Sequence, residues 1–177
     1  MANIIPGMVH LYVGDGKGKT TAAIGLAVRA QGAGRRVLIA QFLKGQDSSE
    51  REPLRRLGID LIRTEELKKF VSQMDDAERA EAKVVCNRCL DTVSEMLLAG
   101  RYDFVVLDEV VDAVNCGLID SARLLTVLAT RGEGVELVMT GRNPGDKIVE
   151  AADYLTVMTA LKHPYRRGVM SRKGIEF

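Results

Sequence analysis

The sequence lacks tryptophan and has only three cysteines, four prolines and a net charge of +1 among its 177 residues. Three cysteines are too few for a disulfide framework. Lysine and arginine (25) nearly balance aspartate and glutamate (24), which argues against a general nucleic-acid-binding surface. An apolar fraction of 46% excludes a disordered chain and indicates a globular protein.

Long hydrophobic runs are also missing, since no stretch approaches the roughly 18 apolar residues of a membrane span. The start, MANIIPGMVHLYV, lacks the basic region and long apolar run of a secretory signal. We therefore expect a cytoplasmic protein with reduced thiols and no membrane contact. Without internal repeats or a low-complexity linker, residues 1–177 are expected to form one domain.

Short apolar runs alternate with helical patterns along the chain, which predicts an α/β fold with a mostly parallel sheet flanked by helices. The near-continuous apolar character of the runs indicates strands covered on both faces. Two stretches, 44–50 and 159–177, are expected to be irregular. The predicted strands are 8–13, 37–42, 59–63, 104–107, 135–140 and 154–158, and the predicted helices are 19–31, 75–98, 120 or 121 to 130, and 144–152.

Two of the three cysteines, Cys86 and Cys89, form a CxxC inside the predicted helix 75–98. A zinc site of this kind requires a second CxxC, and none follows. We interpret both thiols as packing residues of the helix.

The segment VHLYVGDGKGKTTAAIGLA consists of a strand, a glycine-rich turn and a helix that begins with Lys-Thr. This is the setting of a phosphate-binding P-loop. The glycines allow backbone amides to approach phosphate oxygens, the helix N-terminus adds positive potential, Lys19 can reach the phosphates and Thr20 offers a hydroxyl to Mg²⁺. The predicted nucleotide-binding residues of this loop are Gly14, Asp15, Gly16, Lys17, Gly18, Lys19, Thr20 and Thr21.

The spacing of this loop departs from the standard pattern, which has four residues between the first glycine and the Gly-Lys pair. Here only Asp15, Gly16 and Lys17 separate Gly14 from Gly18. We expect a shorter loop that seats phosphates differently from an ordinary P-loop.

Further candidate residues follow other predicted strands, where parallel sheets place their ligand sites. Asp108 and Glu109 follow an apolar run, an arrangement that holds Mg²⁺ opposite a P-loop threonine, and we favour Glu109 as the nearer ligand. Arg142 could contact phosphates or remain solvated. Glu50 and Arg51 could contact nucleotide or form an exposed helix start.

The two histidines receive different interpretations. His10 lies in the middle of a strand, where a buried and hydrogen-bonded side chain is favoured over a metal ligand. His163 lies in the basic tail LKHPYRRGVMSRKGIEF, which either meets anionic groups or is a solvated end.

Taken together, the short glycine loop, LDEVVDAVNCGLI, TGRNP and the KHPYRRGVMSRKGIEF tail resemble the P-loop type of ATP:corrinoid adenosyltransferase along nearly the whole chain. The resemblance implies a RecA-like P-loop NTPase fold and a homodimer. It also implies an electron-donor flavoprotein as a partner. It implies transfer of 5′-deoxyadenosyl from ATP to Co(I) of a corrinoid, with release of triphosphate, in cobalamin biosynthesis or salvage. Lys19, Thr20 and Glu109 would be catalytic, with Thr20, Glu109 and Asp108 serving Mg²⁺ as cofactor.

The sequence departs from some members of this family at the corrinoid side. Those members carry a helix before the first strand, whereas here the first predicted strand begins at residue 8. They also carry a Phe and Trp pair before the long helix, and in this chain only Phe70 lies in that region. Phe70 is the corrinoid-contacting residue that the resemblance implies.

Two other functions remain open. A nucleoside-kinase-like P-loop phosphotransferase is disfavoured by the short loop and by the absence of a fourth cysteine for the zinc site common in that group. A binding protein that senses ATP or delivers corrinoid would hold both ligands without turnover.

Overall fold

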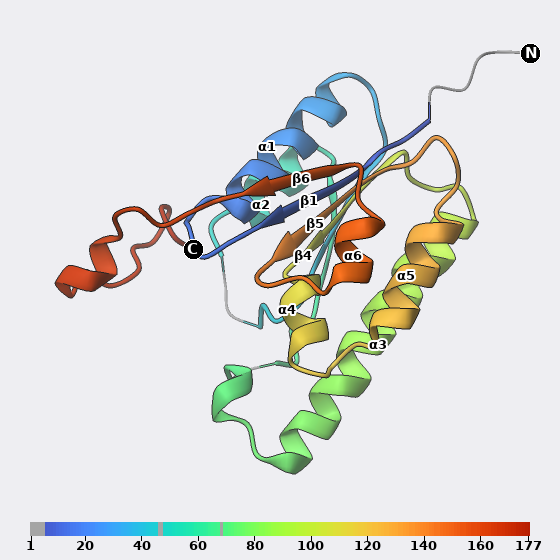
Figure 1. Ribbon diagram of the computed structural model, residues 1–177. Helices are drawn as coiled ribbons and strands as arrows, with labels where there is room; N and C mark the ends of the chain where they lie inside the picture. The colour runs from blue at the N-terminus through green and yellow to red at the C-terminus, as the bar shows by residue number, and fades with distance from the viewer. Residues whose placement is uncertain (1–5, 46–47, 68) are drawn as a thin grey trace, which may run out of the picture.

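The computed structural model describes residues 6–45, 48–67 and 69–177 and contains one six-stranded sheet (Figure 1). The strand order is β3-β2-β4-β5-β1-β6, and every neighbouring pair in it is parallel. The α/β prediction is thus confirmed, and each strand overlaps a predicted one. The strands are β1 Val9–Val13, β2 Val37–Gln41, β3 Asp60–Arg63, β4 Phe104–Asp108, β5 Glu136–Gly141 and β6 Tyr154–Val157.

Helices cover both faces of the sheet (Figure 1). Because side chains alternate along each strand, the sheet contributes to two separate cores. The helices are α1 Lys19–Gly32 and α2 Arg51–Arg56 on one face, and α3 Asp76–Leu98, α4 Val110–Asn115, α5 Ser121–Thr130 and α6 Asp146–Glu150 on the other. Two short 3₁₀ helices are η1 Val71–Gln73 and η2 Pro164–Arg167.

The two cores differ in the size of their side chains. Helix α1 packs through Ala23, Ala27 and Ala30, which are small enough to bring its backbone close to the sheet. The opposite core contains larger residues such as Leu90 and Leu124. Burying one such leucine contributes about 1.5–3 kcal/mol to the stability of the fold. Packing on both faces therefore stabilises the sheet from which the loops emerge.

The ends of the long helices follow from local capping. The Asp75 side chain accepts a hydrogen bond from the Glu78 amide, and the Glu78 side chain accepts one from the Asp75 amide, which completes a capping box before α3. Asp120 caps α5 by accepting from the amide of Ala122 at 2.8 Å. The predicted helix 144–152 is too long at both ends, since α6 begins after Gly145 and ends at Glu150.

The expectation that the strands are covered on both faces holds for β2 and β4 and is wrong for β6. Strand β6 is an edge strand whose residues are all exposed. The irregular stretches are confirmed where described, apart from η2, while residues 46 and 47 lie outside the described residues. None of the described helices combines the length and apolar character needed to cross a membrane.

The cysteine pair lies on the inner face of α3, as predicted. Cys86 and Cys89 are 0% and 6% exposed and belong to the larger core. Burial raises the pKa of each thiol to about 12. Both cysteines therefore act as small apolar side chains.

Candidate active site

A cleft of about 550 Å³ opens where the loops after β1, β4 and β5 meet. Parallel sheets place ligand sites at these carboxyl ends because the strand ends converge there. The predicted residues that line the cleft are Asp15, Gly16, Lys17, Gly18, Lys19, Thr20, Thr21, Phe70, Glu109 and Arg142.

The N-terminus of α1 faces this cleft through the glycine loop. Gly18 is the N-cap residue, with φ of 113°, and no side chain in the described part of the chain caps the helix. The first turn also lacks an acidic residue. The helix therefore keeps its positive potential and its unpaired amides for an anion.

Two glycines of the loop are required for its packing, in addition to any close approach of phosphate. The Gly16 amide donates a hydrogen bond to the Met158 carbonyl at 2.7 Å. A Cβ at Gly14 or Gly16 would lie 2.3 Å or 2.6 Å from that same oxygen. Close packing of the loop against the end of β6 thus requires both glycines.

Lys19 spans the loop. Its ammonium donates to the carbonyl of Gly14 at 2.7 Å and to that of Gly16 at 2.9 Å. Partial burial lowers its pKa, and nearby Arg142 lowers it further. These two hydrogen bonds hold the charge over the glycine loop.

Asp108 ends β4 and is almost fully buried, at 1% exposure. One carboxylate oxygen, Oδ1, accepts hydrogen bonds from the hydroxyls of Thr20 and Thr140, both at 2.8 Å. The other, Oδ2, accepts from Gln41 at 3.3 Å and lies 3.0 Å from the Lys44 ammonium. Asp108 therefore positions the groups around it and has little capacity left for a direct ligand.

Glu109 is the more accessible of the two acids, since its side chain is 34% exposed. Its backbone has φ of 61°, and its amide donates to the Thr140 hydroxyl at 2.8 Å. Burial, followed by repulsion from Asp108, raises the pKa of Glu109 to about 7. Its exposure in the cleft lining leaves the carboxylate accessible to a cation, which would replace the proton that the raised pKa favours.

Strained backbone surrounds the cleft. Among the described residues, the non-glycine residues with positive φ are Leu43, Glu109 and Asn143, at 59°, 61° and 46°. They follow β2, β4 and β5, which are neighbours in the sheet. Such conformations cost of order 1–3 kcal/mol each and concentrate at functional sites.

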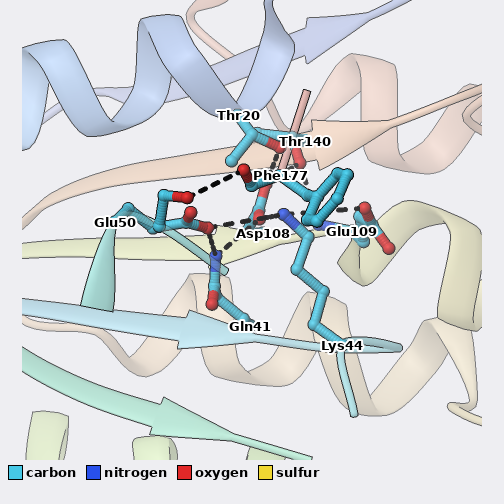
Figure 2. A network of polar contacts seen from close by, with 9 residues as sticks. Thr20, Gln41, Lys44, Glu50, Asp108, Glu109, Thr140 and Phe177 are labelled. Atoms are coloured by element: carbon cyan, nitrogen blue, oxygen red, sulfur yellow. Dashed lines mark hydrogen bonds and ion pairs between the residues drawn. The ribbon is translucent and has the colours of Figure 1, made fainter. Parts of the chain in front are cut away.

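Sequence reasoning missed Lys44, which lies at the centre of a polar network (Figure 2). Its ammonium lies 3.0 Å from Asp108 and 3.9 Å from both Glu50 and Glu109. Burial lowers the pKa of Lys44, but the carboxylates, led by Asp108, outweigh that effect and the pKa is raised. Gln41 joins the network by donating to Glu50 at 3.0 Å.

The remaining predicted contacts separate into two groups. Arg142 lines the cleft, and its carbonyl is held by the Asn115 side-chain amide at 2.7 Å. Glu50 joins the network around Asp108. Arg51 instead forms an ion pair with Glu65 at 2.8 Å and lines a different surface depression. The structure thus brings Glu50, but not Arg51, to the P-loop side.

The cleft lining also includes apolar side chains. Phe70 lies there with 65% of its surface exposed, beside Leu43, Leu67 and Val71. The C-terminal tail leaves β6 and turns back toward the sheet (Figure 1). Its residues His163, Ile175 and Glu176 form part of the cleft lining. The Ser49 hydroxyl fixes the chain end by donating to the Phe177 carbonyl at 3.0 Å.

The other histidine is structural, as predicted. His10 is hydrogen-bonded to Glu136 at 2.5 Å and stacks on Tyr154. It does not line the cleft.

The donor set suits a magnesium ion completed by phosphates. Within the described residues, no group of three or more His, Cys, Asp or Glu side chains could hold a metal by itself. Mg²⁺ usually takes one or two carboxylates together with substrate phosphates and water. The Thr20 hydroxyl and Glu109 carboxylate, both in the cleft lining, fit that pattern.

Sheet order, glycine loop and the threonine-aspartate pair define a P-loop nucleotide-binding protein. Consistent with this fold, the chain is similar to a solved structure of EssC (ATPases 2 and 3) from Geobacillus thermodenitrificans, with a TM-score of 0.50 and 15% identity, covering 95% of this chain and 35% of that one. It is also 31% identical to RecA of Mycobacterium ulcerans over 103 residues, which are 58% of this chain and 25% of that protein.

Sequence comparison identifies the family within this fold class. Residues 6–177 match the family model "ATP:corrinoid adenosyltransferase BtuR/CobO/CobP". The corrinoid adenosyltransferase of Pseudomonas aeruginosa is 31% identical, over 97% of this chain and 84% of that protein. That of Escherichia coli K12 is 30% identical, over 97% and 86%. The chain therefore belongs to the ATP:corrinoid adenosyltransferase family, and it is a transferase that uses ATP and a corrinoid.

Proposed function

We propose that the cleft binds Mg·ATP beside a reduced corrinoid and transfers the 5′-deoxyadenosyl group of ATP to Co(I), releasing inorganic triphosphate. The family match over residues 6–177 carries this proposal. The cleft supports it, because an anion-binding helix end and apolar side chains line one cavity.

The chemistry requires positioning more than proton transfer. Co(I) supplies the electron pair that forms the bond to the 5′ carbon, while the carbon-oxygen bond breaks and its electron pair leaves with triphosphate. The nucleophile carries no proton, so no general base is needed. The task of the protein is to align the 5′ carbon with cobalt and to stabilise the departing anion.

The residues of the loop suit the departing anion. The amides at the start of α1 and the ammonium groups of Lys17 and Lys19, which line the cleft, would surround the phosphates. Lys19 would exchange its bonds to the Gly14 and Gly16 carbonyls for phosphate oxygens. Arg142, on the cleft wall, adds a further positive charge.

Magnesium belongs to the same proposal. We assign Thr20 and Glu109 as its protein ligands and Asp108 as the residue that orients Thr20 through their 2.8 Å hydrogen bond. When bound, the ion would neutralise charge on the triphosphate. Lys19, Thr20 and Glu109 are thus the proposed catalytic residues.

Phe70 and its apolar neighbours are the proposed corrinoid contact. An exposed aromatic ring on a cleft wall offers a large flat surface to a macrocycle at small entropic cost. These side chains and the P-loop line the same cleft, which suits transfer between the two ligands.

The assembly and setting are further proposals. Edge strand β6 exposes Tyr154, Leu155 and Val157 by 52%, 49% and 60%, which suits burial in a homodimer. An electron-donor flavoprotein would supply Co(I). Three free cysteines suit a reducing cytoplasm, and we treat residues 1–177 as one functional domain.

Product analysis tests the proposal. The protein is incubated anaerobically with Mg·ATP and a chemically reduced corrinoid, and nucleotide and corrinoid products are separated. We expect adenosylcorrinoid and triphosphate. Accumulation of ADP with unalkylated cobalt would instead identify a kinase-like activity, and binding of both ligands without a cobalt-carbon bond would identify a binding protein.

A further inference from the structure

Lys44 lies among three acidic side chains of the site (Figure 2). It follows Leu43, whose positive φ of 59° turns the chain directly after β2. Its side chain is 22% exposed, and the ammonium lies 3.0 Å from Asp108 Oδ2. The carboxylates of Glu50 and Glu109 each lie 3.9 Å away, so that one cation serves three acids.

Among the described residues, the hydrogen-bond donors to Asp108 other than Lys44 are neutral. Thr20, Thr140 and Gln41 donate hydrogen bonds to Asp108 but bring no charge. Lys19 and Arg142 also act electrostatically on Glu109, but among the described residues Lys44 is the cation whose ammonium lies within 4 Å of all three carboxylates. Without a cation among them, their mutual repulsion would favour either protonation or uptake of another cation.

We propose that Lys44 occupies the cation position of this carboxylate cluster until the nucleotide arrives, so that the divalent metal binds with ATP and not before it. This inference rests on the magnesium role proposed above. Lys44 is a positioning residue here, since it acts through Asp108 and Glu109. A triphosphate in the cleft supplies the negative charge that lets a metal ion and the ammonium coexist.

Two substitutions of Lys44 separate the effect of its charge from the effect of its shape. Lys44→Met removes the ammonium while keeping an unbranched side chain, and should open the cluster to a divalent ion without nucleotide. Lys44→Arg keeps the charge and should leave metal affinity low. Lys69→Met removes the same charge from a cleft-lining lysine that pairs with Glu78 instead, and is the matched control.

The experiment uses Mn²⁺ as probe and follows its binding by water proton relaxation, which distinguishes free, ATP-bound and protein-bound ion. Without ATP, we expect Lys44→Met to bind Mn²⁺ at least about tenfold more tightly than the wild type. Lys44→Arg and Lys69→Met should match the wild type. Thermal unfolding verifies that each variant is folded, and Lys44→Gln replaces the Met variant if that one is not.

Two outcomes would overturn the inference, and they differ. If the wild type forms a ternary complex with Mn²⁺ and ATP that Glu109→Gln weakens, while Lys44→Met without ATP binds no more tightly than the wild type, the role of Lys44 is wrong and the magnesium proposal stands. If ATP binds but no ternary complex forms, the magnesium proposal is wrong as well.

Discussion

The amide of Gly16 is hydrogen-bonded to the carbonyl of Met158 at 2.7 Å, which ties the P-loop to the end of β6. This contact predicts the effect of Gly16→Ala. An alanine Cβ would lie 2.6 Å from the Met158 oxygen, and backbone on both sides would have to move. We expect a loss of about 1–3 kcal/mol in the free energy of unfolding and much weaker ATP binding. Chemical denaturation and equilibrium ATP titration measure both.

Gly25→Ala is the matched control for that prediction. Gly25 lies inside α1, and a Cβ there would meet nothing within 4 Å. The same substitution should therefore stabilise the protein by about 0.5–1 kcal/mol through helix propensity. Equal effects of the two substitutions would contradict the account of the loop.

We expect Glu109→Gln to lower the activity and to raise the stability of the folded protein at alkaline pH. In the folded protein the pKa of Glu109 is raised from 4.5 to about 7. The folded state thus holds this proton more tightly than the unfolded state does. The stabilisation from Glu109 is complete below pH 4.5 and is lost as the pH rises through about 7.

It follows that Glu109→Gln should match the wild type near pH 4 and exceed it at pH 8 by about 1 kcal/mol, allowing for partial exposure. Denaturation in metal-free, nucleotide-free buffer measures the difference, with the exposed Glu81→Gln as control. Adenosyl transfer should fall about a hundredfold. A variant that is less stable than the wild type at pH 8 would count against this electrostatic account.

Phe70→Ala tests the apolar part of the cleft lining. Because the ring is 65% exposed, its removal should leave the melting temperature nearly unchanged. The KM for corrinoid should rise about three- to tenfold through lost apolar contact, with little change for ATP. Tyr165→Ala removes an equally exposed ring that is not in the cleft lining, and should change neither constant.

Thiol titration tests the structural role of the CxxC. Burial raises the pKa of all three thiols, to about 12 for Cys86 and Cys89, and Cys116 differs from these two because it is only half-buried and lines the cleft. In native protein at pH 8, Cys116 should react with a thiol reagent and be protected by ATP, while the other two react only after unfolding. Native reactivity of the pair, or bound zinc, would refute this interpretation.

Much of the fold is predictable from the sequence because its causes are local. The glycine loop and Lys-Thr mark the start of α1, and Asp75 and Asp120 cap α3 and α5. Helix α4 was missed because its six residues are too few for a helical period, and because Val110 and Val111 continue the apolar run of β4. The exposure of β6 depends on its place at the sheet edge, which the strand itself does not encode.

The candidate site divides in the same way. Loop residues such as Lys19 and Thr20 are recognisable from spacing, since a single strand-turn-helix unit places them. Lys44 meets Asp108 only because β2 and β4 are neighbours in the sheet although β3 and α3 separate them in sequence. Likewise, no local signal shows that Met158 dictates glycine at position 16.

The central claim is transfer of an adenosyl group, and the most direct measurement follows cobalt-carbon bond formation and triphosphate release together in one anaerobic reaction. The account predicts that both products appear at the same rate in a one-to-one ratio, and that Lys19→Ala, which removes the loop-spanning ammonium, abolishes both. ADP accumulating while the cobalt remains unalkylated, or unchanged turnover by Lys19→Ala, would contradict it.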